Sequence, residues 1–267
     1  GLMRPATLAV LLATILTLMP GATVFAQGQP DGRQPQVGRL ATALDTQTPD
    51  ARPKATVVRR GPRSSGAVAL TFDDGFDARA CADITRTLRR YDAVGTFFIN
   101  GLWLKREPSR WRRILEGMEV ANHTRSHRDL TTASRSVLVN QIRSNEYLHE
   151  TILGRPMLKV LRPPFGAFGD RTRRVAKELG YDQLVLWNVD SGDWKPKAKA
   201  KRIARAATGA PPGSIILMHC AHDATAKALP RIVRHYQRRG IEVAGLSVVL
   251  EGAKDQADGG SFQRYER

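Results

Sequence analysis

Two adjacent carboxylates, Asp73 and Asp74, directly follow an apolar run from Ala67 to Phe72. A run of this kind, bounded by glycines, predicts a buried strand that ends at the acidic pair. Neighbouring carboxylates repel each other, and a bound cation or a nearby arginine would relieve the repulsion and give the two acids different roles. The alternative is that Asp74-Gly75 is a hairpin turn.

Two imidazoles, His123 and His127, stand four residues apart. On a helical turn they would share a face and could bind one metal ion, although a solvated turn would show the same spacing. One upstream carboxylate, such as Asp74, would complete a set of two histidines and one acid with open positions, which is typical of catalytic zinc. Non-haem iron oxygenases use the same ligand types. They usually place one His and the acid only two residues apart, so the order found here favours hydrolysis.

Further polar residues could complete such a site. Asp73 would remain free to take a proton from the attacking water. Arg162 could hold Asp73 ionised, or could be a surface charge before a Pro-Pro turn. His219 follows an apolar run and could be a general acid whose tautomer is set by Asp193, or a satisfied core histidine. Two apolar residues are candidates for the wall of a small pocket, or for plain core packing: Trp194 and Leu217.

The elements that must position these residues alternate between strands and helices, which predicts a parallel sheet with crossover helices. We expect strands at 67–72, 94–100, 118–122, 160–161, 183–189, 214–218 and 242–244. We expect helices at 78–90, 107–117, 134–153, 170–179, 197–207 and 225–239. Most of the candidate residues follow the carboxyl end of a predicted strand, and in a parallel α/β barrel those ends gather on the face that holds the active site.

The two ends of the chain differ from its middle. Arg4, an apolar stretch at 8–19 and Val24-Phe25-Ala26 have the pattern of a secretory signal at 1–26, with an uncleaved membrane anchor as the alternative. Once the signal is cleaved, no stable membrane span is expected. Residues 27–65 are rich in Gln, Pro, Gly and Arg without an apolar period and predict a disordered linker. An ordered domain at 66–250 and a polar tail at 251–267 follow.

The net charge of +17 favours anionic binding partners. Nucleic acid, anionic lipid and anionic cell-wall polymers all bind basic surfaces. Export disfavours nucleic acid, and the arginines show no interleaved aromatic pattern that would support it. An anionic wall is therefore the expected surrounding. In an exported protein the two cysteines, Cys81 and Cys220, could form a disulfide or remain buried thiols.

Five segments occur in the order that characterises one enzyme family. The sequence resembles the polysaccharide deacetylases (the NodB-homology domain, carbohydrate esterase family 4) over about 66–250. The resemblance rests on Thr71-Phe72-Asp73-Asp74, His123-Thr124-Arg125-Ser126-His127, Arg162-Pro163-Pro164-Phe165, Asp190-Ser191-Gly192-Asp193-Trp194 and Leu217-Met218-His219. It implies an α/β fold, a distorted and incomplete (β/α) barrel with fewer than eight complete units.

The resemblance also implies a role for each matching residue. A divalent metal ion, usually zinc, would be held by Asp74, His123 and His127. Asp73 would be the general base and His219 the general acid. Arg162 would tether Asp73, Asp193 would tune His219, and the backbone N–H of Phe165 would help to stabilise the oxyanion. Trp194 and Leu217 would line the pocket for the acetyl methyl group.

Three positions depart from the family's pattern. Phe165 stands where Tyr is common, which matters little if only its N–H is used. Phe76 stands where Pro is common after Asp-Asp-Gly, so the entry into the first helix could differ. Cys220 replaces a polar residue that often follows the acid histidine and could mark a disulfide that fixes His219.

These observations predict an exported, monomeric, metal-dependent deacetylase of the bacterial cell wall. Its substrate would be a polymer of the peptidoglycan or chitin type, from which it hydrolyses acetyl groups of N-acetylglucosamine. One alternative is an O-acetyl esterase of the acetylxylan type with the same site. Another is an inactive wall-binding module, but such a relative should have lost Asp73 or His219, and both are present.

Overall fold

The computed structural model describes residues 52–254 and 256, and within them the chain forms a curled, nine-stranded parallel sheet. The strand order is β1-β6-β5-β4-β3-β2-β8-β7, with β9 paired to β2. The strands are β1 (Thr56–Val58), β2 (Ala67–Asp74), β3 (Thr96–Ile99), β4 (Glu119–Asn122), β5 (Leu158–Leu161), β6 (Gln183–Val185), β7 (Val189–Asp190), β8 (Ile215–His219) and β9 (Glu242–Ala244). The predicted incomplete (β/α) barrel is confirmed.

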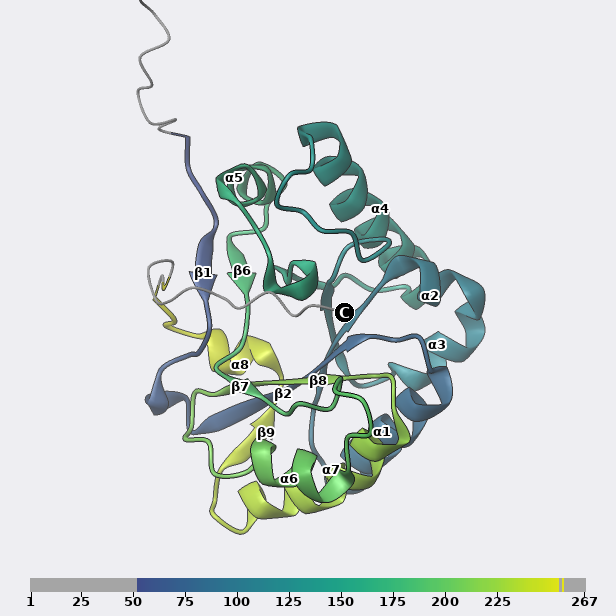
Figure 1. Ribbon diagram of the computed structural model, residues 1–267, viewed down its shortest axis with the longest axis vertical. Coiled ribbons are helices and arrows are strands. Elements are labelled where there is room, and N and C mark those ends of the chain that lie inside the picture. Colours follow the sequence, from purple (N-terminus) through teal and green to yellow (C-terminus); the bar gives the residue numbers. More distant parts are fainter. Residues whose placement is uncertain (1–51, 255, 257–267) are drawn as a thin grey trace, which may run out of the picture. The chain divides into compact units, whose positions relative to one another are not determined.

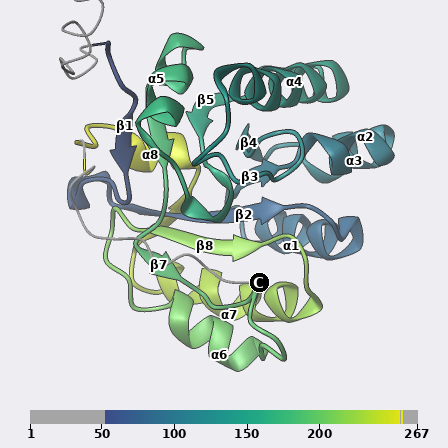
Figure 2. The same ribbon diagram turned by 45° about the horizontal axis from the view of Figure 1, so that its top comes forward.

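Helices cover the outside of this sheet, and in Figure 1 α4, α3, α1, α7 and α6 follow its right and lower rim. Figure 2 shows β5, β4, β3, β2 and β8 stacked one beside the next. The helices are α1 (Ala78–Arg90), α2 (Gly101–Arg106), α3 (Pro108–Ile114), α4 (Arg135–Leu153), α5 (Asp170–Glu178), α6 (Ala200–Ala207), α7 (Asp223–Gln237) and α8 (Leu246–Leu250). Two short 3₁₀ turns, η1 (Arg63–Ser65) and η2 (Pro164–Gly166), precede β2 and follow β5. No helix in the described part of the chain is both long enough and apolar enough to pass through a bilayer.

Between β6 and β7 the chain crosses from one end of the strand order to the other. The predicted single strand at 183–189 is wrong, since only 183–185 pair with β5 and β1, and only 189–190 pair with β8. In the connection, the Leu186 N–H donates to the Val58 carbonyl at 2.8 Å, and the Asn188 N–H donates to the Ile215 carbonyl at 3.2 Å. The first bond attaches the start of the connection to β1 and the second attaches its end to β8, so the connection spans the two sides of the incomplete barrel.

The side chains of β2 separate the two halves of the core. Val68, Leu70 and Phe72 pack in the cluster that contains the buried faces of α1 and α7. The alternate residues Ala67 and Ala69 belong to the second cluster, with residues of β5, β6 and β8. Because neighbouring residues of a strand point to opposite faces, Thr71 and Asp73 continue the row that begins with the two alanines. Asp73 is therefore directed into the barrel, at its carboxyl-terminal end.

Several predicted helix ends are confirmed by their capping contacts. The carboxylate of Asp77 accepts hydrogen bonds from the backbone N–H groups of Arg79 and Ala80 at the start of α1. Ser134 accepts from the Val137 N–H at the start of α4, and Gly154 ends that helix with a φ of 69°. These contacts satisfy backbone groups that have no partner within the helix.

The structure corrects the predicted boundary of the linker. Residues 56–58 lie within the segment that was expected to be disordered, yet they form β1 and pair with β6, with Val57 and Val58 fully buried. Three residues are too few to show a period in a polar, arginine-rich sequence. At the other end, the side chain of Gln256 in the predicted polar tail accepts a hydrogen bond from the Arg59 N–H. The predicted signal segment, the linker up to residue 51 and most of the tail lie outside the described residues.

Candidate active site

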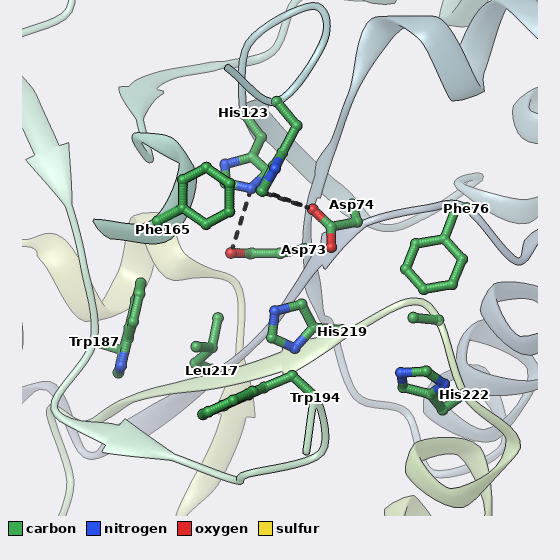
Figure 3. A pocket seen from close by; sticks show the side chains of 12 residues that line it. Asp73, Asp74, Phe76, His123, Phe165, Trp187, Trp194, Leu217, His219 and His222 are labelled. Carbon is green, nitrogen blue, oxygen red and sulfur yellow. Dashed lines mark ion pairs between the residues drawn. The ribbon is translucent and has the colours of Figure 1, made fainter. Parts of the chain in front are cut away.

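A cavity of about 250 Å³ opens where the carboxyl ends of β2, β4 and β8 meet. Figure 3 shows the carboxylates and imidazoles near its centre, with aromatic side chains on both sides. The structure brings together here most of the predicted site residues: Asp73, Asp74, His123, His127, Phe165, Trp194, Leu217 and His219. Two more, Arg162 and Asp193, are buried behind the cavity and contact residues that line it. The sequence-based set therefore forms one site.

The two neighbouring aspartates reach the same cavity because the backbone changes conformation between them. Along a regular strand, Asp73 and Asp74 would point to opposite faces. Asp74, however, has a φ of 73°, in the left-handed region that non-glycine residues rarely adopt. Its carbonyl accepts the Asn100 N–H at 3.0 Å, which keeps this last residue of β2 attached to the neighbouring strand β3. The predicted hairpin alternative is wrong, because β2 runs parallel to both of its main neighbours.

Asp74, His123 and His127 form a cluster with the geometry of a metal site. Each offers one ligand atom, and these atoms all lie within 4.8 Å of one another. The Nε2 atoms of His123 and His127 lie 3.5 and 3.3 Å from Asp74 Oδ1. That oxygen is buried and accepts no hydrogen bond from the described residues. A buried carboxylate oxygen rarely lacks a hydrogen-bond partner, and a cation shared with two imidazoles would satisfy it.

The two histidines do not share a helical turn, as the spacing suggested. His123 directly follows β4, and the segment up to His127 is an irregular loop. Thr124 and His127 have positive φ values of 67° and 55°. These left-handed residues bend the loop so that the second imidazole comes back to the first, with the ring centroids 5.0 Å apart.

Buried amides hold this loop in place. Asn100 Nδ2 donates to the carbonyls of His123 and Thr124 at 2.7 and 3.2 Å. Asn122 Oδ1 accepts from the Thr124 N–H at 2.9 Å and from Asn145 Nδ2 at 3.0 Å. Asn100 and Asn145 were not predicted as site residues from the sequence. Asn100 ends the predicted apolar strand at 94–100 and directly follows β3 in the structure, so it has the same signal as the residues that were found.

The tautomer of His123 follows from one contact. Its Nδ1 lies 2.7 Å from the Arg162 carbonyl oxygen, which can only accept a hydrogen bond. Nδ1 therefore donates, and the lone pair of Nε2 is directed toward Asp74. A backbone carbonyl on the distal nitrogen is a common way to orient an imidazole that binds a metal.

The ionisation states of the cluster suit a cation. Burial alone would raise the pKa of Asp74, but its close contact with His123 and the charges of the nearby imidazoles outweigh it and hold the pKa well below its usual range. Burial, together with the charge of His123, lowers the pKa of His127 to about 4. Near neutral pH the acid is ionised and the His127 imidazole is neutral, and these are the forms that bind metal ions.

Arg162 is fully buried and all of its hydrogen-bonding nitrogens are occupied. Nη1 donates to Asp73 Oδ1 at 2.7 Å and to Thr71 Oγ1 at 2.8 Å. Nε and Nη2 donate to the backbone carbonyls of Val185 and Leu186 at 3.1 and 3.0 Å. The guanidinium carbon also lies 4.0 Å from the centre of the Phe98 ring. A charge this deeply buried needs a partner, and Asp73 supplies it.

His219, the last residue of β8, is bound to Asp193 through two hydrogen bonds. Its Nδ1 lies 2.8 Å from Asp193 Oδ1, and its backbone N–H donates to Asp193 Oδ2 at 2.7 Å. Thr225 Oγ1 donates to the same Oδ2 at 2.7 Å and was missed by sequence analysis. Burial lowers the pKa of His219, but the hydrogen bond and charge of Asp193 raise it more, to about 9. The imidazole is therefore protonated near neutral pH.

Apolar side chains line the space beside His219. Leu217 lies two residues earlier on β8, and Trp194 donates its indole N–H to Asp190 at 3.2 Å. Trp187, which sequence analysis missed, joins them from the connection between β6 and β7 (Figure 3). The ring of Phe165, whose backbone has a φ of 60°, lies 4.5 Å from that of His127. Phe76, which was noted above only as a departure from the family's pattern, and His222, which was not predicted, lie on the opposite side of the cavity.

Cys81 and Cys220 are joined in a disulfide. Cys81 lies in the first turns of α1, and Cys220 directly follows His219. The Cys220 N–H also donates to the Asp73 carbonyl at 2.9 Å. Of the two possibilities that the sequence left open, the bond is therefore the one present, and it lies immediately behind the cavity.

Comparison with known proteins gives consistent matches. Residues 60–184 match the family described as Polysaccharide deacetylase. The chain is 31% identical over 207 residues to a peptidoglycan-N-acetylglucosamine deacetylase of Bacillus cereus, covering 75% of this chain and 96% of that protein. It is 34% identical over 191 residues to the peptidoglycan-N-acetylmuramic acid deacetylase PdaC of Bacillus subtilis, covering 71% of this chain but 40% of that protein. A crystal structure of the Bc1960 peptidoglycan N-acetylglucosamine deacetylase superposes with a TM-score of 0.69 and 29% identity, covering 76% of this chain and 96% of that one.

Proposed function

The chain belongs to the polysaccharide deacetylase family, and from this premise we propose that it hydrolyses the acetamido groups of N-acetylglucosamine units in peptidoglycan. The relatives named above support this substrate, since their names assign them to peptidoglycan. The observation that carries the proposal is the arrangement of two groups around one cavity. A cluster of Asp74, His123 and His127 lies beside a protonated His219 that is held by Asp193.

A divalent cation, most simply zinc, fits the donor set of Asp74, His123 and His127. Two nitrogens and one carboxylate oxygen leave positions open for a substrate oxygen and for water. When bound, the ion would polarise the acetyl carbonyl and make the attacking water more acidic. The buried Asp74 oxygen, which accepts no hydrogen bond from the described residues, is the structural support for this assignment.

Asp73 is the general base in this proposal. It lies beside the cluster, with its Oδ2 3.8 Å from His123 Nε2, and it projects into the cavity from β2. Its other oxygen accepts the hydrogen bond from Arg162. The buried guanidinium pairs with this carboxylate and fixes its orientation, so that Oδ2 can accept the proton of the attacking water.

His219 is the general acid. Hydrolysis of the amide forms a bond between the water oxygen and the acetyl carbon and breaks the bond between that carbon and the sugar nitrogen. The leaving nitrogen needs a proton, and His219 can donate one from Nε2 because Asp193 holds Nδ1 and raises its proton affinity. The products are acetate and a free amino group on the sugar.

Three further residues complete the proposed site. Trp194 and Leu217 line the side of the cavity next to His219, where they would receive the methyl group of the acetyl unit. The backbone N–H of Phe165 would donate a hydrogen bond to the oxygen that becomes negative during the attack. Trp187 extends the same apolar wall and would help to exclude water from the methyl group.

The setting of this activity is part of the proposal. Peptidoglycan lies outside the cell membrane, so we expect the segment at 1–26 to be an export signal and 27–51 to be a linker. The net charge of +17 favours residence in an anionic wall. We expect the enzyme to act as a monomer, since the cavity is built from one chain.

Metal content and acetate release test this proposal together. Wild-type protein loaded with zinc should hold about one ion per chain and should release acetate from peptidoglycan. His123→Ala should lose both properties, whereas His235→Ala, on α7 away from the cavity, should keep both. Acetate release from acetylated xylan alone would replace the proposal with an O-acetyl esterase. Binding to peptidoglycan without acetate release by the zinc-loaded protein would indicate an inactive wall-binding module.

A further inference from the structure

A second cleft continues from the candidate active site across Phe76. It has a volume of about 610 Å³ and shares Phe76 and Ala221 with the catalytic cavity. It runs along the start of α1 and reaches α2 and α3, where Trp103, Arg106 and Arg110 form part of its lining. A polymer held in the cavity by one sugar unit can therefore extend into this cleft with the next unit.

Phe76 separates the two spaces and is itself accessible. Phe76 is one of the few large apolar residues that are exposed in the described part of the chain, with 47% of the residue accessible to solvent. Its ring lies 6.2 Å from that of Trp103 and edge-on to His222 at 5.8 Å. In Figure 3, Phe76 and His222 lie on the side of Asp74 and His219 away from Phe165 and Trp187. Exposed aromatic residues grouped at a cleft mark a binding surface, and the apolar face of a sugar ring fits it.

Among the described residues, the ion pairs of the cleft leave one lining cation, Arg106, without an acidic partner. Arg79 pairs with Asp223 at 2.9 Å, and Arg110 pairs with Glu107 at 2.9 Å. Arg106 forms no ion pair with any described residue. Its guanidinium carbon lies instead 4.1 Å from the centre of the Trp103 ring. Stacking of this kind orients a guanidinium while leaving its N–H groups directed outward, where they can bind a carboxylate.

We propose that this cleft binds the sugar unit next to the one that loses its acetyl group, and that Arg106 recognises a carboxylate on that unit. The inference rests on the proposed function. In peptidoglycan the neighbour of N-acetylglucosamine is muramic acid, whose lactyl group or peptide stem carries a carboxylate. In chitin the neighbour is neutral and offers Arg106 no charged partner. The cleft therefore selects peptidoglycan strands over chitin, with Phe76 packed against the neighbouring sugar ring.

Two soluble substrates of equal length separate charge recognition from catalysis. One is a tetrasaccharide of N-acetylglucosamine, and the other alternates N-acetylglucosamine with N-acetylmuramic acid that has free lactyl carboxylates. We expect Arg106→Gln to lower kcat/KM for the acidic substrate by about five-fold, the upper range for an exposed ion pair, and to leave the neutral substrate unchanged. Lys105→Gln removes the same charge from the adjacent residue of α2 outside this cleft and should change neither value. Phe76→Ala should lower kcat/KM for both substrates.

The outcomes distinguish this inference from the function on which it rests. If Arg106→Gln leaves both substrates unaffected, or lowers both equally, the acidic subsite is wrong while the deacetylase activity stands. If the zinc-loaded wild type releases no acetate from either tetrasaccharide or from intact peptidoglycan, the proposed function fails and the subsite fails with it. Loss of the Arg106 effect at high salt, with the neutral rate unchanged, would further support an ion pair.

Discussion

At the scale of single residues, Asp193 gives His219 both its orientation and its proton affinity. The carboxylate accepts from Nδ1 and from the backbone N–H of the same residue, so the imidazole can neither rotate nor change its tautomer without breaking a buried hydrogen bond. Thr225 holds the second carboxylate oxygen. A raised pKa means that the proton is retained as the pH increases, which suits a group that must donate it.

The pH dependence of Asp193→Asn tests this relation. The proposed general acid must be protonated, so wild-type kcat/KM should fall on the alkaline side as His219, with a pKa raised to about 9, loses its proton. In the variant, burial still lowers the pKa of His219 but the charge that raised it is gone. The alkaline limb should therefore move to lower pH by about one unit or more. Steady-state kinetics across the pH range would measure the shift.

Asp190→Asn is the matched control, since Asp190 bonds Gly192 and Trp194 rather than His219. Its alkaline limb should stay at the wild-type position, even if the rate changes. An alkaline limb that remains in place in Asp193→Asn would mean that another group sets it, and His219 would lose its assigned role.

Residue types could be predicted from the sequence more readily than residue conformations. Asp73 and His219 were found because polar residues that end apolar strands of a parallel sheet must gather at one face. The side chain of Asp74 reaches the same cavity as that of Asp73 because Asp74 has a positive φ, and no pattern in the neighbouring sequence predicts that conformation. Trp187 lies in the short crossing between β6 and β7, and the predicted single strand at 183–189 hid that crossing. These conformations depend on tertiary contacts.

At the scale of elements, the long helices and the buried strands could be predicted, but the shortest elements could not. The start of α4 was identified from Ser134 and its end from Gly154, because capping residues act locally. By contrast, α2 begins at a glycine, which is a poor helix former. The three residues of β1 form a strand because they pair with β6, and this pairing cannot be recognised from their own sequence. Elements of this size are stabilised by the surfaces they contact, so their own sequence carries little information.

The disulfide joins α1 to the residue that follows His219, and its removal should lower the stability of the protein. Cys81 in α1 and Cys220 after β8 are 139 residues apart, so the bond restricts a long loop of the unfolded chain. Cys81→Ser combined with Cys220→Ser should lower the free energy of unfolding by about 2–4 kcal/mol. Denaturant unfolding of both proteins, each with and without reductant, would measure the change.

Reductant provides an internal control for this prediction. It should lower the stability of the wild type to that of the double variant and should leave the double variant unchanged. A wild type as stable in reductant as without it would contradict the expected contribution of the bond. Activity of the double variant would show separately whether the bond also fixes His219, since Cys220 is its neighbour.

At the scale of the whole molecule, two features can contribute to binding of the polymer: the small cavity and the positive charge of the chain. The cavity is small, and the acetyl group that we propose it binds is neutral, so its affinity should depend on shape and on a few directed contacts. The charge of the chain is spread over 42 basic and 25 acidic residues and acts over distance. Basic residues at the surface concentrate the protein on an anionic polymer without contributing to the chemistry. These two contributions should therefore respond differently to salt.

Salt should weaken retention of the protein on the wall while leaving catalysis on a small neutral substrate unchanged. Between about 0.1 M and about 1 M NaCl the Debye length falls from about 10 to about 3 Å, which screens most interactions between a basic surface and an anionic polymer. We expect the fraction that sediments with insoluble cell wall to fall steeply over this range. The KM for a neutral N-acetylglucosamine tetrasaccharide should stay constant, because its contacts are short and uncharged. Equal salt responses in the two assays would show that the net charge of +17 does not direct the protein to its polymer.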